Sequence, residues 1–277
     1  MAELSYCAEQ VRLFDNDRFL ASLFAGEAVR EDLFALYAFN LELSKIRETV
    51  SEPMIGRMRL QFWRDALPGV AAGNPPKHAV AEPLAKCVAR AGISESELAA
   101  LVDARETDLD DVPPRDLAAF EDYAVRTSSS VMALALRVLG EDPECHADLL
   151  RAAGIAVALI GLVRAIPFMA AAGRVTLPAD LCARAGLDPA QPHQWPQNPD
   201  MSEITGPLLA AAARHLYDTR GKIPGRTALP AFLPLSLAAL YLKDLKKVGG
   251  DPARHAARPP GVRRPLTVLW RSVLGRV

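Results

Sequence analysis

The chain has 277 residues and 50% of them are hydrophobic, so it can bury a sizeable core as one large domain or two small ones. Its 32 lysines and arginines nearly balance its 33 aspartates and glutamates, which argues against a protein built to bind nucleic acid. Its 4 cysteines have no paired spacing, so they fit neither a disulfide framework nor a zinc site and are typical of a reducing compartment.

The N-terminal region, residues 3–29, carries apolar side chains at helical spacing around the polar run 15–18. This pattern favours a loop followed by a core helix over a chemical role for Asp15 or Asp17. The first residues include acids and no basic-then-apolar segment, so we expect neither a secretory signal nor a spanning helix. These features together predict a cytoplasmic protein.

The stretch Leu33–Glu48, LFALYAFNLELSKIRE, is predicted to form one helix. On such a helix, positions 37, 41, 44 and 48 share one face. A boundary follows at 49–53, where a serine can cap the next helix and a proline is tolerated in its first turn.

The next predicted helix runs from Met54 to Leu67 and carries two different stripes. The apolar stripe contains Met58 and Phe62, and we expect it to face the core rather than a cofactor. The second stripe contains Arg57 and Arg64, and it is either a solvated face or a docking patch.

An acidic run closes the helical segment that follows. Asp108, Asp110 and Asp111 form the strongest carboxylate cluster in the chain. The cluster could bind a metal, but two prolines follow it at 113–114, so a solvated helix end and loop is the favoured interpretation. A further helix is predicted over Phe120–Gly140.

The stretch Leu149–Ile166 is predicted to be a buried helix. Residues 152–163 are continuously apolar or small, but charged residues close this run after about a dozen residues, short of the roughly 20 that a bilayer needs. Gly154 and Gly161 are expected where another helix or a ligand comes close. Pro167 is expected to end or kink the helix just before it.

The C-terminal third is predicted to hold a proline-rich surface excursion at 184–207, a long helix ending near Lys247, and a basic tail. The tail, 249–277, contains six arginines among apolar residues and Trp270. A short basic amphipathic helix with a tryptophan can lie on a membrane surface. The alternative is a final helix packed on the rest of the protein.

The stretch 149–178 resembles the second signature of the squalene/phytoene synthase family, which reads approximately Q-x-x-N-I-x-R-D-x-x-x-D-x-x-x-G-R-x-Y-L-P. The residues in register are Arg164, Gly173, Arg174, Leu177 and Pro178. Where the family has its two magnesium-binding aspartates, this chain has Ala165 and Met169.

The first signature of that family, Y-A-F-x-R-x-x-D-x-x-x-D, is matched by the run that begins at Tyr37. Leu41 stands at the arginine position, and Ser44 and Glu48 stand at the two aspartate positions. Of the four carboxylates that the resemblance implies, one glutamate remains.

Magnesium is held by one or two protein carboxylates together with substrate phosphates, and it neutralises the charge that develops on a leaving diphosphate. Because Ser44, Ala165 and Met169 supply no carboxylate, we expect loss of synthase chemistry, with no catalytic residue, no metal and no cofactor. The pocket itself is expected to persist. Its expected ligand-binding residues are Tyr37, Lys45, Glu48, Arg164 and Arg174.

Three runs, AFNLEL, IGRMRLQFW and VRAIP, resemble a branch of the family that includes the phytoene-synthase-like assembly factors of respiratory complex I. The resemblance implies an all-α fold, a single domain over 1–277 that forms an isoprenoid-synthase-like helical bundle with a central cavity. It also implies a pseudoenzyme, a binding or assembly factor with complex I subunits as partners. We expect this factor in the cytoplasm, with peripheral membrane contact at the inner face through 249–277.

Two alternatives stay open. The first is an active prenyltransferase that condenses prenyl diphosphates, with Mg²⁺ recruited by Glu48 and Asp108 or by the run 108–111. The second is a metal-free binder of isoprenoid phosphate or lipid, in which Lys45 and Arg164 hold the phosphate. Such a binder would take a diphosphate equally well in the presence of a chelator, whereas the enzyme would not.

Overall fold

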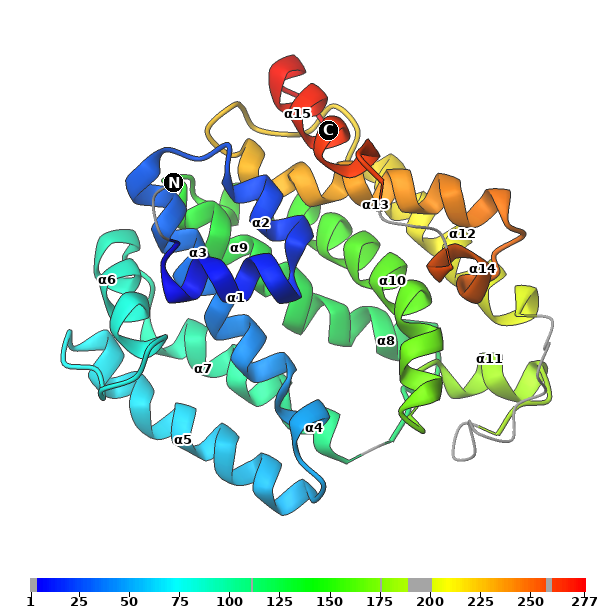
Figure 1. The fold of residues 1–277 in the computed structure, drawn as a ribbon, viewed down its shortest axis with the longest axis horizontal. Coiled ribbons are helices and arrows are strands. Elements are labelled where there is room, and N and C mark those ends of the chain that lie inside the picture. Colours follow the sequence, from blue (N-terminus) through cyan, green and yellow to red (C-terminus); the bar gives the residue numbers. More distant parts are fainter. Residues whose placement is uncertain (1–3, 111, 175, 189–200, 258–260) are drawn as a thin grey trace.

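The computed structural model describes residues 4–110, 112–174, 176–188, 201–257 and 261–277, and within these ranges the regular elements are helices, without a strand (Figure 1). The all-α prediction is therefore confirmed. Most of the predicted proline-rich excursion at 184–207 lies outside the described residues. Its last part belongs to a helix, because α12 (Ser202–Asp218) already begins at Ser202.

The buried apolar side chains form two clusters. Helices of the first cluster are α1 (Tyr6–Phe14), α3 (Glu27–Ser44), α5 (Pro53–Ala71), α6 (Ala81–Ala91), α7 (Glu95–Ala104) and α9 (Ser130–Val138). Helices of the second cluster are α8 (Leu117–Ala124), α11 (Ala179–Arg184), α12 and α15 (Arg263–Leu274). Two helices, α10 (Ala147–Ala171) and α13 (Leu229–Lys247), contribute to both clusters and so join them.

Helix α3 is buried on nearly all sides from Asp32 to Leu43, as expected for a helix in the centre of a protein. The predicted continuation to Glu48 is wrong. The Ser44 hydroxyl donates to the Leu41 carbonyl, the helix ends at Ser44, and the short α4 (Ile46–Thr49) begins after Lys45. The break lets Ile46 reach the core and leaves Glu48 exposed.

Helix α10 is a core helix of 25 residues, and its prolonged apolar run is mostly buried. By length and composition, the stretch Pro143–Ala171 is the one described helical segment that could cross a membrane, but 67% of its most apolar window is buried inside the protein. The expected end of the helix before Pro167 is wrong, because α10 continues to Ala171. A proline this close to a C-terminus removes one backbone donor while Ile166 keeps its place in the core.

Helix α5 packs on a different face from the one predicted. Met58 is 66% exposed and Phe62 is 42% exposed, so the expected core stripe is wrong. The buried side chains are instead Leu60, Trp63 and Leu67. Trp63 reaches further into the core than Phe62 can from its side of the helix, and it packs edge-on against Phe39 of α3.

The arginines of α5 form ion pairs with the acidic segment that ends α7. Arg57 pairs with Asp110 at 2.8 Å, and Arg64 pairs with Asp103 at 2.8 Å and with Glu106 at 2.6 Å. This stripe is thus neither a plain solvated face nor a free docking patch. It fastens α5 to α7.

Candidate functional site

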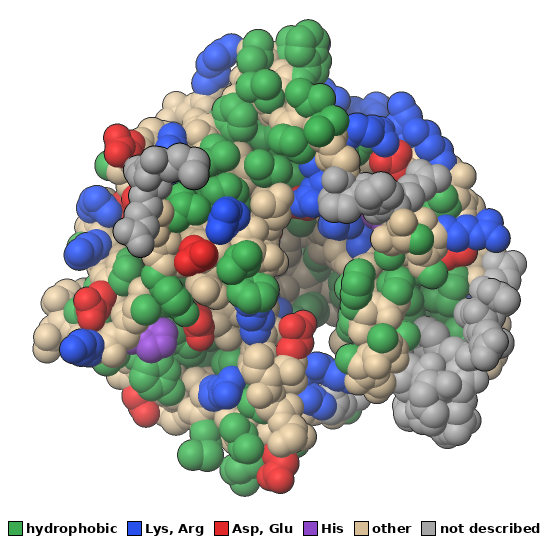
Figure 2. Space-filling view, in the orientation of Figure 1, with side chains coloured by type: hydrophobic (Ala, Val, Ile, Leu, Met, Phe, Trp, Pro, Cys, Tyr) green, Lys and Arg blue, Asp and Glu red, His purple; other side chains and the backbone are tan. Residues whose placement is uncertain are grey.

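The surface of the molecule is hollowed in the middle of the face shown in Figure 2, beside helix α10 of Figure 1. Helix α10 is buried along most of its length but leaves Ala158, Gly161 and Ala165 partly or fully accessible. These positions recur at helical steps, so they form one stripe of small side chains. A Cβ atom at Gly161 would meet nothing within 4 Å, which shows that the stripe borders open space.

Arg164, the cation of the second signature, lies in a cluster of charges centred on Asp17 of α2 (Asn16–Ser22). Its guanidinium is 3.6 Å from the Asp17 carboxylate and stacks on the Tyr241 ring at 3.7 Å from the centroid. The Tyr241 hydroxyl donates to both Asp17 oxygens at 2.8 and 2.9 Å. Arg264 of α15 donates to Asp17 at 2.5 Å and to Asn16 at 3.2 Å.

The electrostatics of this Asp17 cluster follow from burial and pairing. Burial, followed by the nearby Asp17 charge, raises the pKa of the Tyr241 phenol, so the hydroxyl remains a donor. Burial lowers the pKa of Arg264, but its pairing with Asp17 outweighs that effect and the net pKa is raised. Asp17 is therefore a carboxylate already engaged by two guanidinium groups and one phenol.

A second cluster surrounds Arg105, between α7 and α8. Arg105 donates to the Tyr123 hydroxyl at 2.8 Å, to Asp108 at 3.4 Å and to the Asn40 side chain of α3 at 3.4 Å. Burial raises the pKa of Tyr123, and the neighbouring Arg105 lowers it by less than burial raises it. Asp108, the candidate metal ligand of the open alternative, is thus tied to an arginine.

Tyr37 begins the first signature and is 3% exposed. The Arg18 guanidinium lies over its ring at 5.4 Å from the centroid and pairs with Asp15 at 2.5 Å. Burial raises the pKa of Tyr37 to about 12. The structure therefore makes Tyr37 part of the packed interior beside a buried ion pair.

The other first-signature positions lie at the end of α3. Lys45 places its ammonium over the Phe14 ring of α1, and burial lowers the pKa of Lys45. Ser44 is half-buried and bonded to its own helix, and Glu48 is exposed. The predicted continuous helix would place Ser44 and Glu48 on one helical face. In the structure they do not share a face.

The second-signature positions lie at the end of α10. Ala165 and Met169 are half-buried, and the Thr176 hydroxyl lies 3.7 Å from the Met169 sulfur. Arg174 donates to the Arg47 carbonyl at 3.3 Å and so brings the segment after α10 against α4. The two signatures thus meet in space although they are more than a hundred residues apart in the chain.

The predictions for the two glycines of α10 have different outcomes. A Cβ atom at Gly154 would lie 2.2–2.5 Å from Ser129, including its backbone, so the expected close approach is confirmed there. At Gly161 no neighbour lies within 4 Å, so no other helix approaches it. In the described part of the chain, no group of three or more histidine, cysteine, aspartate or glutamate side chains is placed to hold a metal ion.

Sequence reasoning missed the partners of Arg164. Asp17 was expected to have a structural role, Tyr241 lies in the predicted long helix that ends near Lys247, and Arg264 lies in the basic tail, for which the sequence allows both a membrane-surface helix and a packed helix. One signal was present: the tail from 249 onward holds a single acidic residue, Asp251, so any further ion pair of its arginines needs an acid from elsewhere in the chain.

Comparison with known proteins gives consistent relationships. A family model described as squalene/phytoene synthase matches residues 11–267. A Bos taurus protein named NADH dehydrogenase (ubiquinone) complex I, assembly factor 6 is 34% identical over 273 residues, which cover 96% of this chain and 81% of that protein. A presqualene diphosphate synthase of Sinorhizobium fredii is 28% identical over 192 residues, which cover 69% of this chain and 68% of the enzyme.

Solved structures show the same architecture. A dehydrosqualene synthase in complex with a ligand superposes with a TM-score of 0.78 at 17% identity, covering 97% of this chain and 94% of the other. A squalene synthase from Alicyclobacillus acidocaldarius superposes with a TM-score of 0.76 at 17% identity, covering 89% and 94%. These likenesses confirm the predicted isoprenoid-synthase-like helical bundle.

Proposed function

The chain belongs to the squalene/phytoene synthase family, and from this premise we propose that it is a non-catalytic member that binds or assembles respiratory complex I. Support for the partner comes from relatives named as complex I assembly factor 6, which match 96% of this chain at up to 34% identity. The predicted partners, complex I subunits, are part of this proposal.

The contacts of Asp17 are the observation that supports a non-catalytic role. This carboxylate lies beside Arg164 and is already engaged by two arginines and Tyr241, so it has little capacity left for a cation. We propose that the magnesium-binding aspartates have been lost, with Ala165 and Met169 in two of their places. Prenyl-diphosphate ionisation would then lack the cation that neutralises its leaving group.

An activity assay tests this part directly. Purified full-length protein is incubated with farnesyl or geranylgeranyl diphosphate, Mg²⁺ and NADPH, and diphosphate release is followed beside a Glu48→Ala variant. We expect no release above the variant, because Glu48 is exposed on α4 and stands alone as a carboxylate among the four signature positions. Release well above that of Glu48→Ala would contradict the proposal and favour the active prenyltransferase with Mg²⁺ as its cofactor.

The amount of assembled complex I tests the proposed partner. We expect deletion of the chain from its source organism to lower the amount of assembled complex I on native gels and the NADH:quinone activity of membranes. Re-expression of the wild-type chain and of Glu48→Ala should restore both equally, because the proposed role does not use metal chemistry. Normal complex I in the deletion strain would exclude the assembly role.

Binding of an isoprenoid phosphate or lipid without metal is the second candidate function, because the stripe of small side chains on α10 borders open space beside Arg164. Titration with farnesyl diphosphate separates the cases. Equal affinity with and without chelator supports a binder, and loss of affinity on adding chelator supports the enzyme. Lys45→Gln and Arg164→Gln should each weaken binding if these cations hold phosphate.

We also propose that the protein is cytoplasmic and touches the inner face of the membrane through 249–277. Within α15, Leu266, Trp270 and Val273 are 56–64% exposed, while Val268 is 1% exposed and faces the core. Hydrophobic side chains cover the part of the surface in Figure 2 where Figure 1 places α15. An exposed apolar face on a basic helix is what an interfacial helix requires. Cell fractionation with and without high salt measures this contact.

A further inference from the structure

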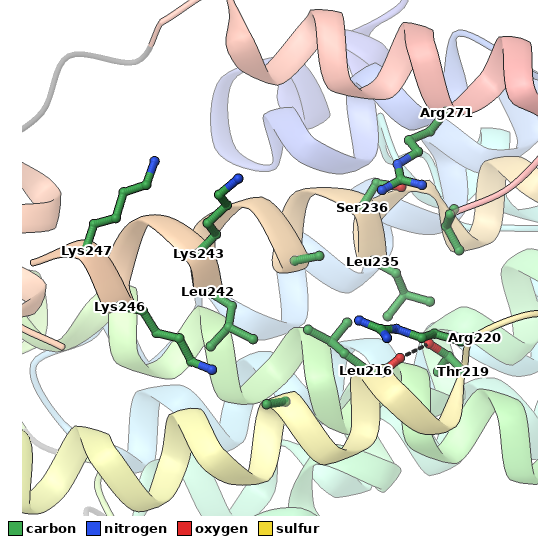
Figure 3. Close-up of a pocket in the computed structure, with 13 residues that line it drawn as sticks. Leu216, Thr219, Arg220, Leu235, Ser236, Leu242, Lys243, Lys246, Lys247 and Arg271 are labelled. Carbon is green, nitrogen blue, oxygen red and sulfur yellow. Dashed lines mark hydrogen bonds between the residues drawn. The ribbon is translucent and has the colours of Figure 1, made fainter. Parts of the chain in front are cut away.

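A pocket separate from the Asp17 cluster lies between α12, α13 and the C-terminal helix α15 (Figure 3). Its volume is about 620 Å³, a size suited to a small organic ligand. The helices that form it contribute mainly cationic and apolar side chains, with Thr219 and Ser236 as hydroxyl groups. Among the described residues that line it, none is acidic.

Five cationic side chains line this pocket, and four of them are Arg220, Lys243, Lys246 and Arg271. None of the four forms a salt bridge within the described ranges, whereas Lys247 at the pocket edge is held by Asp244 at 3.4 Å. In Figure 3, Arg220 and Lys246 extend into the space between α12 and α13, and Arg271 reaches down from α15. Like charges gathered without counter-charges raise the local positive potential, and an anion relieves the repulsion.

The floor of the pocket is apolar. Leu235 and Leu242 of α13 and Leu216 of α12 line it. Ser236 lies on the side of α13 that faces Arg271 (Figure 3), is 4% exposed, and has no hydrogen-bond partner for its hydroxyl oxygen in the described structure. A buried hydroxyl without a partner is costly, so a polar group that enters the pocket would gain a bond there.

The position of the pocket connects it with a surface suited to lipid. Arg271 lines the pocket and belongs to α15, whose Leu266, Leu269 and Trp270 are 48–64% exposed. A bilayer that contacted this face of α15 would present its phosphate groups at the level of the neighbouring basic residues. The exposed apolar face of α15 is therefore followed by the basic rim of the pocket and then by its apolar floor. This order suits an amphiphile with an anionic head group.

We propose that this pocket binds an anionic phospholipid taken from the membrane surface, with the phosphate held between α12 and α13 by Arg220 and Lys246, and with Lys243 and Arg271 adding to the positive potential at the rim. Part of an acyl chain lies on the leucines of the floor. The inference rests on the membrane contact proposed for α15 and deepens it by naming the lipid class and the residues that select it.

Two binding measurements on the full-length protein test the proposal. The first is titration with soluble short-chain phosphatidylglycerol below its micelle concentration, which needs no bilayer. The second is co-sedimentation with vesicles of phosphatidylcholine alone and vesicles that also contain phosphatidylglycerol. The pocket variant is Lys243→Gln/Lys246→Gln, and its control is Lys77→Gln/Lys86→Gln, which removes the same charge on and before α6.

We expect the wild type and the control to bind the short-chain lipid equally. The pocket variant should bind it roughly thirtyfold more weakly, since each basic residue near an anionic lipid contributes about a fivefold factor. Equal binding by the pocket variant and the control would overturn the proposal. So would inorganic phosphate that binds as tightly as the lipid, because the site would then be one for free phosphate.

The membrane contact of α15 and the lipid-binding pocket can be contradicted by different results. Leu269→Ser/Trp270→Ser should lose vesicle binding and keep binding of the short-chain lipid, because both side chains are exposed and neither is among the residues that line the pocket. If the wild type binds the short-chain lipid but no vesicle, the membrane contact of α15 is wrong and the pocket stands. If the wild type binds anionic vesicles but not the short-chain lipid, the pocket assignment is wrong and the contact of α15 stands.

Discussion

Asp17 accepts hydrogen bonds from Tyr241 and Arg264 and lies 3.6 Å from Arg164, so one carboxylate balances two partly buried cations. Asp17→Asn would keep the shape of the side chain but leave both guanidinium groups without a counter-charge. We expect a loss of about 1–3 kcal/mol in the free energy of unfolding, measured by urea denaturation.

The matched control for this change is Glu9→Gln. Glu9 and Arg12 form a pair in which both side chains are about half exposed, so its removal should cost less than about 0.5 kcal/mol. If Asp17→Asn costs no more than Glu9→Gln, the Asp17 cluster contributes nothing to stability.

Tyr37 gives a prediction for alkaline pH. Its pKa is raised to about 12 by burial, whereas a tyrosine in the unfolded chain titrates near 10. Between these values the unfolded chain releases the phenol proton and the folded chain does not, so stability falls as the pH rises. Tyr37→Phe should make this decline shallower by up to about 1.4 kcal/mol per pH unit.

The control for Tyr37→Phe is Tyr217→Phe, because the Tyr217 side chain is 68% exposed. Urea denaturation at a series of pH values between the two pKa values measures both variants. An alkaline decline that is the same in wild type and Tyr37→Phe would mean that Tyr37 ionises freely in the folded protein.

Single residues of the site could be predicted from the sequence only as far as they belong to a motif. Arg164, Arg174 and Tyr37 were found through the two signatures. Asp17 and Arg264 are 247 residues apart, and no periodicity or motif links them. A salt bridge between distant segments depends on the packing of whole helices, which local patterns do not encode.

At the scale of elements, α10 carries two glycines two turns apart on one side of the helix, and their surroundings differ. Gly154→Ala would place a Cβ atom 2.2–2.5 Å from Ser129, and because backbone atoms are among those met, the helices must move apart. We expect a loss of about 1–3 kcal/mol in the free energy of unfolding. Gly161→Ala meets nothing within 4 Å and should stabilise by about 0.5–1 kcal/mol through helix propensity.

Thermal or urea denaturation of the two variants measures both effects, and each serves as the control of the other. Opposite signs are the expected result. Destabilisation by Gly161→Ala would show that the space beside α10 closes in solution, which would also weaken the case for a ligand there.

The elements themselves were largely predictable, and their errors share one physical cause. The helix of the first signature was extended past Ser44, the helix of the second was ended before Pro167, and the core face of α5 was placed on Met58 and Phe62. In each case the local pattern was ambiguous and packing decided. In α5 the side chains that turn inward are Trp63 and Leu60, which are 3% and 0% exposed.

At the scale of the whole molecule, the two core clusters share α10 and α13, so we expect residues 1–277 to unfold as one cooperative unit. Leu36→Ala removes a fully buried side chain from the first cluster, and Leu237→Ala removes one from the second. Each should cost about 2–5 kcal/mol and move the same transition.

Unfolding followed by tryptophan fluorescence and by circular dichroism measures these two variants, and coincident transitions are the expected result. If Leu36→Ala moved one transition and Leu237→Ala another, the chain would consist of two domains rather than one. The fold class was predictable from the signatures, whereas the number of cooperative units depends on long-range contacts that the sequence does not display.

The contact of Arg264 with Asp17 has a consequence for how the protein is made. At a synthesis rate of 5–20 residues per second, roughly 10–50 s separate the appearance of the two partners. Until α15 leaves the ribosome, Arg164 and Tyr241 hold Asp17 without its second guanidinium. The complete Asp17 cluster thus exists only on chains translated as far as α15, and a product terminated before α15 would display an incomplete cluster.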